Sequence, residues 1–295
     1  MESEFSEQSL ARALESWPQW NLSLANKPRV VKALSGGLTN RNYLLNVDFR
    51  DKDLLETEAC LLVIRVNNPA TQLLGIDRVR EQKILESLAG QHALGKGFAP
   101  KMVYCNPDDG LLVMEYIEGR HWPVEELKNP SKLKKLLRVF KQVGEVRDGF
   151  LEFDYRAHIE HYWRGLQSTG SKDKNLTTRF QQAKIAVEQL SEINRDKPRV
   201  LCHHDLSPLN VIETLRGELV LLDWEYAGGG WPVMDYVALI RNWQLCESQA
   251  FILNTLNNNG VEFSNVDFTT AEVKAAHQVW EFIDSAWHSL NTPLV

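Results

Sequence analysis

Apolar and polar residues alternate near the start of the chain in a pattern that predicts strands joined by turns. A short helix is expected over 6–16, and three strands are expected over 30–34, 42–49 and 60–66. The first two strands are separated by Ser35-Gly36-Gly37, a turn-forming sequence whose glycines permit a tight reversal. These three strands should therefore form an antiparallel meander.

An amphipathic segment and a hairpin follow the meander. Over 76–89 apolar residues recur at roughly helical spacing with charges between them, and Gly90 ends the pattern. Two strands, over 101–105 and 111–117, flank an Asn-Pro-Asp-Asp-Gly turn, which has the chemistry of a hairpin. An antiparallel sheet with one main helix is thus predicted for residues 1–117.

Beyond Gly119 the pattern changes from strands to helices. Helices are predicted over 131–146, 158–166, 177–193 and from about 233 onwards, with a polar stretch near 168–175. Short β-like pieces stand among them, over 200–202, 210–213 and 218–222. The predicted fold class is α+β with two lobes, residues 1–117 and 118–295, because a chain of 295 residues is at the limit of a single core.

Composition and charge exclude several classes of protein. The chain is 43% hydrophobic with a net charge of -6, which argues against binding to nucleic acid or to an anionic membrane surface. The N-terminus is acidic, unlike a secretion signal, and no apolar run approaches the ~20 residues that cross a bilayer. Four widely spaced cysteines without a C-x-x-C pair favour reduced thiols and a cytoplasmic location.

The strongest chemical signal is the spacing of His203, Asp205 and Asn210, which follows the pattern H-x-D-x-x-x-x-N. In phosphoryl transfer from ATP, an aspartate on such a loop accepts the proton of the attacking hydroxyl, and the asparagine binds magnesium. Asp223 follows thirteen positions after Asn210, at the end of the apolar run 219–222, where it could complete the magnesium site. The ordered set predicts a kinase.

The same residues have alternative interpretations from other classes of protein. His203 and His204 could be ordinary loop histidines or zinc ligands of a metal-dependent hydrolase. Such a hydrolase would need more histidines downstream than His277 and His288, and it leaves the glycines unexplained. A catalytically inert kinase fold that only binds nucleotide is disfavoured, because the aspartates and the asparagine of the pattern are all present.

Two segments resemble the aminoglycoside phosphotransferase and choline kinase superfamily of small-molecule kinases, which have a two-lobed, protein-kinase-like fold. Residues 34–45 are similar to the nucleotide-binding loop of choline and ethanolamine kinases. Residues 222–228 are similar to the metal-binding segment shared by choline kinases and bacterial thiamine kinases. The resemblance covers roughly 28–290. It implies ATP and Mg²⁺ as cofactors, 1–117 as the nucleotide-binding lobe, and 118–295 as the lobe with the catalytic loop and acceptor site.

The resemblance assigns roles on the nucleotide side. Backbone amides at Gly36 and Gly37 would approach the phosphates. Arg65 would take the place of the kinase lysine, with Glu81 as its partner, and main-chain groups of residues 114–117 would bind adenine. The complete predicted nucleotide-binding set is Ser35, Gly36, Gly37, Leu38, Thr39, Asn40, Arg65, Glu81, Met114, Glu115, Tyr116 and Ile117.

The resemblance also assigns roles on the transfer side. Asp205 would accept the proton, and His203 would brace the catalytic loop, so these two are the predicted catalytic residues. The predicted metal residues are Asn210, Asp223 and Glu225, with Glu225 near the γ-phosphate. Asp235 would be a structural brace of the same loop.

Aromatic residues bear on the acceptor, because quaternary and thiazolium cations bind best over aromatic faces. In choline kinases a C-terminal helix supplies such walls, and Trp280 and Trp287 would share one face of a helix here. The family's second tryptophan, three residues after Trp280, is replaced by Ile283, and packing in the core is the alternative role for each aromatic. The predicted acceptor-site residues are Asp205, Tyr226, Trp231, Trp280 and Trp287.

The expected partner is a small-molecule alcohol, and neither nucleic acid nor membrane is expected. Choline comes first and ethanolamine next, since an acidic chain suits a cationic acceptor. Thiamine is the close rival, because residues 222–228 are equally similar to thiamine kinases, and amino sugars including aminoglycosides come third. The sequence is compatible with a monomer or a homodimer.

Overall fold

The computed structural model of the chain describes residues 2–20, 22–34, 40–49, 60–67, 74–93, 97–147, 149–169, 174–245 and 270–291. The predicted nucleotide loop, Ser35, Gly36, Gly37, Leu38 and Thr39, lies outside the described residues. Part of the polar stretch near 168–175 and the sequence at 246–269 also lie outside them.

The N-terminal lobe is built on a five-stranded antiparallel sheet. Its strands are β1 (Arg29–Leu34), β2 (Asn40–Val47), β3 (Cys60–Asn67), β4 (Met102–Asn106) and β5 (Leu111–Glu115), in the order β1-β2-β3-β5-β4. The predicted meander and hairpin are therefore confirmed. The hairpin requires its glycine, because Gly110 has a φ of 62° and a Cβ there would lie 2.8 Å from Nδ2 of Asn67.

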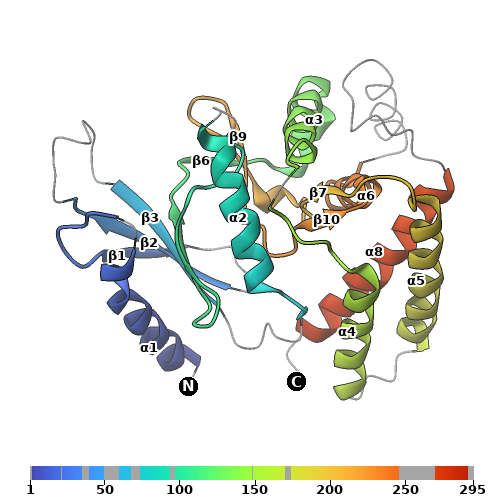
Figure 1. Cartoon of the computed structure of the whole chain (residues 1–295), viewed down its shortest axis with the longest axis horizontal. Coiled ribbons are helices and arrows are strands. Elements are labelled where there is room, and N and C mark those ends of the chain that lie inside the picture. The colour runs from blue at the N-terminus through green and yellow to red at the C-terminus, as the bar shows by residue number, and fades with distance from the viewer. Residues whose placement is uncertain are drawn as a thin grey trace.

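Two helices cover the two faces of this sheet. Residues of α1 (Glu2–Glu15) pack on the face that carries Leu111 and Val113, whereas α2 (Arg78–Ala93) packs on the face that carries Leu112. Successive residues of β5 point to opposite faces, which is why this one strand contributes to two separate cores. Figure 1 shows α2 standing between the sheet and the C-terminal lobe.

The C-terminal lobe is mostly helical and contains two small sheets. Its described helices are α3 (Pro130–Gly144), α4 (Tyr155–Ser168), α5 (Lys174–Ile193), α6 (Pro232–Asn242) and α8 (Thr270–Asn291), and α8 packs against α4, α5 and α6 (Figure 1). One sheet has the order β6 (Gly119–His121), β8 (Val211–Thr214), β9 (Leu219–Leu221), and β7 (Val200–Cys202) pairs with β10 (Gly228–Gly230). Single 3₁₀ turns are η1 (Trp17–Gln19), η4 (Val124–Lys128) and η5 (Pro208–Asn210).

The two-lobed α+β class predicted from the sequence is confirmed. The hydrophobic pattern does not predict β6 or β10, because neither contains a hydrophobic residue: β6 is Gly-Arg-His and β10 consists of glycine alone. It also begins α4 three residues late, because the helix starts after Asp154, whose side chain accepts the main-chain N–H of Ala157 at 2.9 Å. Among the described helices, none is long and apolar enough to span a membrane.

A cluster of ion pairs around the half-buried Glu213 connects β8 to the elements around it. Glu213 accepts hydrogen bonds from Lys132 and Lys135 of α3 at 2.6–3.0 Å. It also accepts them from Arg120 at 2.7 Å and from the Trp122 indole at 3.0 Å. Although burial raises the pKa of Glu213, the bonds from the two lysines lower it to about 2.

Replacing Glu213 with glutamine should lower the free energy of unfolding at pH 7 by about 1–2 kcal/mol, because three cations lose their shared counter-ion. The contribution of Glu213 is present above its ordinary pKa of 4.5 and is lost as the pH falls from there toward 2. The difference between the two proteins in urea denaturation should therefore shrink below pH 4.5. Glu218→Gln changes an exposed carboxylate of the same hairpin, and an equal effect of both substitutions would contradict the role of the cluster.

Candidate active site

The catalytic loop predicted from the sequence connects β7 to β8, and its two main residues lie in direct contact. Asn210 Nδ2 donates to the carbonyl oxygen of Asp205 at 2.9 Å and to Oδ2 of Asp205 at 2.8 Å. The turn η5 folds the asparagine back toward the aspartate. Burial raises the pKa of Asp205 to about 7, although the hydrogen bond from Asn210 opposes this effect. A carboxylate poised near neutral pH suits proton transfer.

His203 ties this loop to the predicted metal segment. Its Nε2 lies 2.9 Å from the carbonyl oxygen of Leu222, and because a carbonyl only accepts, Nε2 carries the proton. Its Nδ1 then accepts the main-chain N–H of Asp205 at 3.2 Å. Burial lowers the pKa of His203 to about 4, so the ring stays neutral and acts as a brace between the two segments.

The backbone takes a left-handed conformation at two places in the site. His204 has a φ of 63° and Asp223 a φ of 60°, values that residues with a Cβ rarely adopt and that cluster at functional sites. Asp235 stabilises the turn at His204, because its two carboxylate oxygens accept the main-chain N–H groups of His203 and His204, each at 2.8 Å. Burial nevertheless raises the pKa of Asp235 to about 6. Asp235 thus braces the loop in the manner expected.

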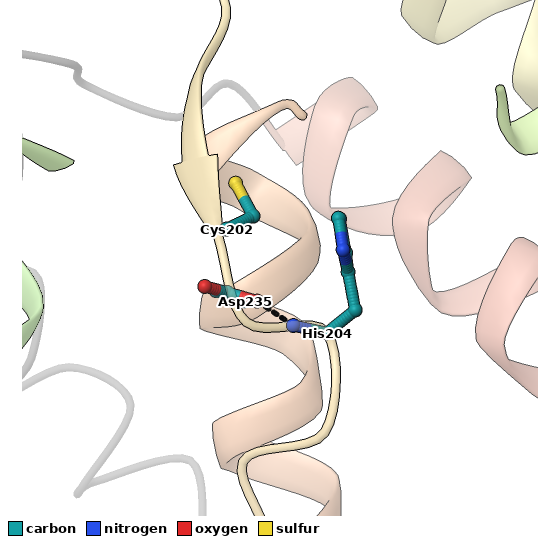
Figure 2. A group of neighbouring side chains, drawn as sticks. All are labelled: Cys202, His204 and Asp235. Carbon is teal, nitrogen blue, oxygen red and sulfur yellow. Dashed lines mark hydrogen bonds between the residues drawn. The ribbon is translucent and has the colours of Figure 1, made fainter. Parts of the chain in front are cut away.

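Where β7 ends and the catalytic loop begins, Cys202 and His204 form a group with Asp235 of α6, and the possible ligand atoms of the three residues lie within 4.8 Å of one another. Figure 2 shows Asp235 bonded to the main-chain nitrogen of His204. The imidazole is fully engaged, since Nδ1 donates to the carbonyl of Tyr226 at 3.0 Å and Nε2 accepts from the Tyr155 hydroxyl at 2.6 Å. Its ring nitrogens are therefore used to support the loop, and the group is a poor metal site.

The predicted metal residues Asn210, Asp223 and Glu225 line one part of a cavity, the metal wall, and Asp205 lines the same cavity. These residues offer the oxygen ligands that Mg²⁺ prefers. Oδ1 of Asp223 is buried and makes no hydrogen bond to any described residue. Burial and the nearby charge of Glu225 raise the pKa of Asp223 well above its ordinary value. A buried carboxylate oxygen without a hydrogen bond, which has only a 3.6 Å ion pair with Arg65, fits a divalent cation.

On the nucleotide side, Arg65 of β3 and Glu81 of α2 form a bidentate pair with hydrogen bonds of 2.5 and 2.6 Å. Both side chains are nearly inaccessible to solvent. Burial opposes charge on each partner, but their mutual attraction raises the pKa of Arg65 and lowers the pKa of Glu81. Nη1 of Arg65 lies 3.6 Å from Oδ1 of Asp223, so this pair borders the predicted metal site.

Glu225 has partners in the N-terminal lobe. Its Oε2 accepts from Nδ2 of Asn40 at 2.8 Å and from Nη1 of Arg78 at 2.9 Å. Asn40 is the first residue of β2 and Arg78 the first of α2. The structure therefore brings the predicted residues Asn40, Arg65, Glu81, Asp223 and Glu225 into one continuous set of contacts.

Residues Met114–Ile117 lie at the end of β5, where the chain leaves the sheet toward β6. The amide of Glu115 donates to the carbonyl of Lys101 at 2.9 Å, and the amide of Tyr116 donates to the carbonyl of Leu61 at 3.2 Å. Those two N–H groups therefore form hydrogen bonds within the N-terminal lobe. The adenine contact of this stretch stays a prediction, and these two N–H groups are already engaged.

The cavity has a volume of about 300 Å³ and extends from the metal wall to α8. It is also lined by the aromatic rings of Tyr162, Tyr226, Trp280 and Trp287, together with Asp284. The Trp280 indole donates to the carbonyl of Met234 at 2.9 Å, which fixes the ring. Three of the predicted acceptor-site aromatics thus share one cavity with Asp205.

Trp231, the remaining predicted acceptor-site aromatic, lies in the core and is not among the residues that line the cavity. Its ring stacks on Tyr155 with centroids 4.6 Å apart, and the guanidinium of Arg199 lies 4.0 Å from its centroid. These contacts agree with packing in the core, which is the alternative role for each of the aromatic residues.

The sequence analysis does not identify several residues of the site. Tyr162 and Asp284 line the cavity, and Arg78 and Tyr155 contact predicted site residues. Asp284 could have been found from helical spacing, because it lies four residues after Trp280 on the same helix. Arg78 and Tyr155 meet partners that are distant in the sequence, so only the fold identifies them.

A two-lobed fold with this catalytic loop, an arginine–glutamate pair and an acidic metal wall defines the class of kinase-like phosphotransferases. Comparison with known proteins is consistent with this class and narrows it. The family model described as choline/ethanolamine kinase matches residues 31–259. The chain belongs to the choline/ethanolamine kinase family.

Individual relatives are distant. LicA of Haemophilus influenzae is 26% identical over 242 residues, which cover 80% of this chain and 65% of that protein. The crystal structure of choline kinase LicA from Streptococcus pneumoniae is 22% identical with a TM-score of 0.67, over 88% of this chain and 86% of that one. A structure of LicA in complex with AMP has a TM-score of 0.68 at 21% identity, over 91% and 86% of the two chains. These two structural matches show a shared fold.

Substitution of Gly230 by alanine should disturb the support of the catalytic loop. A Cβ there would lie 2.3 Å from Oη of Tyr155 and 2.8 Å from Nε2 of His204, so the Tyr155–His204 bond must shift. We expect a loss of about 1–3 kcal/mol in the free energy of unfolding, measured by urea denaturation. Gly144→Ala is the control, because a Cβ at Gly144 meets nothing within 4 Å. Equal stability of the two variants would refute this account.

Proposed function

We propose that the protein transfers the γ-phosphate of Mg-ATP to the hydroxyl of a small cationic alcohol. The observation that carries the proposal is the single cavity in which Asp205, hydrogen-bonded to Asn210, faces aromatic rings and a carboxylate. Such walls suit a cation, and the position of Asp205 suits the proton acceptor of a hydroxyl. Membership of the choline/ethanolamine kinase family supports the same chemistry.

Asp205 is the proposed proton acceptor. The acceptor oxygen forms a bond to the γ-phosphorus while its proton passes to the Asp205 carboxylate, and the bond from that phosphorus to the β,γ-bridging oxygen breaks, so that ADP leaves. Asn210 keeps the carboxylate oriented, and His203 remains a neutral brace. No covalent phosphoenzyme is involved.

The proposed cofactors are ATP and Mg²⁺. Magnesium neutralises charge on the phosphates when bound, and Asn210 and Asp223 would hold it, with Glu225 beside them. Arg65 would contact phosphate in the place of the kinase lysine, oriented by Glu81. The LicA structure with AMP supports a nucleotide site in this fold. The main-chain amides of Gly36 and Gly37 would bind the phosphates.

Choline is the favoured acceptor, and ethanolamine is next. The aromatic rings that line the cavity, together with the carboxylate of Asp284, suit a quaternary ammonium group, and a structurally similar protein is a choline kinase. Thiamine and amino sugars are the alternatives. We also propose a cytoplasmic setting, because Cys105 and Cys202 are free thiols, which a reducing compartment maintains.

Replacing Asp205 with asparagine should lower turnover by roughly 10²–10⁴-fold, because the proton acceptor is lost while its shape is kept. The dissociation constant for Mg-ATP should change by less than about threefold. The measurement is transfer of labelled γ-phosphate to choline, ethanolamine, thiamine and an aminoglycoside, combined with a nucleotide-binding titration. Asp108→Asn, in the exposed β4–β5 turn, is the matched control. Turnover by Asp205→Asn within tenfold of the native protein would show that Asp205 is not the proton acceptor.

Asp284→Asn should raise the KM for choline by about tenfold and leave kcat nearly unchanged, because it removes a negative charge from the acceptor cavity. Oδ2 of Asp284 is held by Arg241 at 2.5 and 3.1 Å, so an asparagine keeps an oxygen for this contact. The KM for 3,3-dimethylbutanol, a neutral isostere of choline, should be the same in this variant as in the native protein. Glu281→Gln, exposed on the same helix, is the control. A KM increase of equal size for both alcohols would show that the charge of Asp284 is not what binds the cation.

A further inference from the structure

Arg78 joins three polar groups from different parts of the chain. Its Nη1 donates to Oε2 of Glu81 at 3.0 Å and to Oε2 of Glu225 at 2.9 Å, and its Nη2 donates to Oδ1 of Asn40 at 2.8 Å. Asn40 completes the triangle by donating to the same Glu225 oxygen at 2.8 Å. One guanidinium therefore connects α2 and β2 of the N-terminal lobe with the segment that follows β9.

These contacts are shielded from water. The side chain of Arg78 is 12% exposed and that of Glu225 is 3% exposed, and Asn40 is buried. Ion pairs on a surface contribute little, but removal of one partner of a buried pair leaves an uncompensated charge. The side chain of Arg78 is therefore needed to hold Glu225 in place.

The positions of the three partners suggest what the contact is for. Glu225 stands two residues after Asp223, and both line the metal wall. Glu81 is shared between Arg78 and Arg65, and Asn40 directly follows the predicted phosphate loop in the sequence. A displacement of Glu225 would thus change the distance between the metal wall and the groups expected to bind phosphate.

We propose that Arg78, with Asn40, is a positioning residue that holds the 223–225 segment against the nucleotide side, so that Mg²⁺ and ATP bind cooperatively. This inference rests on the proposed function. A planar guanidinium can donate to two carboxylates and an amide oxygen at once, whereas the ammonium of lysine is a point charge without that fork. Arginine is therefore required at this position.

The test measures the coupling between metal and nucleotide. The dissociation constant of ATP is determined by calorimetry with and without Mg²⁺, and the ratio of the two values is compared between variants. Arg78→Ala should reduce the tightening by Mg²⁺ about tenfold or more, the usual size of effects from groups that orient metal ligands. Its affinity for ATP without Mg²⁺ should stay within about threefold. Lys83→Ala removes one positive charge from an exposed position of the same helix and should leave the ratio unchanged.

Two further measurements separate positioning from a general structural role. Arg78→Lys keeps the charge and should fold even if Arg78→Ala does not, yet it should still lose most of the coupling. Added ethylguanidinium should restore coupling and turnover in Arg78→Ala, whereas ammonium should not. In a double-mutant cycle, Arg78→Ala and Glu225→Gln should be non-additive, because both disrupt the same contact.

A native-like coupling ratio in Arg78→Lys, or additive effects in the cycle, would overturn the proposal. An absence of Mg²⁺ coupling in the native protein would overturn it as well. Failure of the proposed function has a different signature: the native protein would show Mg²⁺-coupled ATP binding that depends on Arg78, but it would phosphorylate no acceptor.

Discussion

The candidate active site depends on one backbone constraint, the left-handed turn at His204. This conformation is unfavourable for a residue with a Cβ, and Asp235 stabilises it by accepting the two amides that the turn presents. The imidazole of His204 is then held by the Tyr155 hydroxyl on one side and a main-chain carbonyl on the other. The next residue is Asp205, so its direction is set by packing within the C-terminal lobe.

The two lobes contribute opposite charges to the site. The C-terminal lobe supplies Asp205, Asp223 and Glu225, while the N-terminal lobe supplies the guanidiniums of Arg65 and Arg78, which share Glu81. This division places attraction across the interface between the lobes. It also leaves more carboxylates than cations in a desolvated region, which is the electrostatic condition that a divalent metal satisfies.

Local pattern was sufficient to predict the strands of the first sheet and most helices, because their periodicity extends over five or more residues. Spacing was sufficient to predict that Asp205 and Asn210 lie close together, since both belong to one short loop. It was not sufficient for Arg78, whose partner Glu225 lies 147 positions away. Trp231 follows the catalytic loop in the sequence, as the other candidate aromatics of the acceptor site do. Its ring nevertheless stacks on Tyr155 in the core, because the direction of a side chain depends on packing that sequence spacing does not encode.

Burial around the catalytic loop has opposite effects on two kinds of titrating group. It lowers the pKa to about 3 or 4 in three histidines, His158, His203 and His204. It raises the pKa in three aspartates, to about 7 in Asp205, to about 6 in Asp235 and well above the ordinary value in Asp223. Below pH 6.5 the unfolded chain gains protons on the histidines, which favours unfolding, whereas the folded chain gains them first on the aspartates, which favours folding. The two proton uptakes therefore oppose each other in mild acid, so desolvation of this layer makes its stability less sensitive to pH than either set of groups would alone.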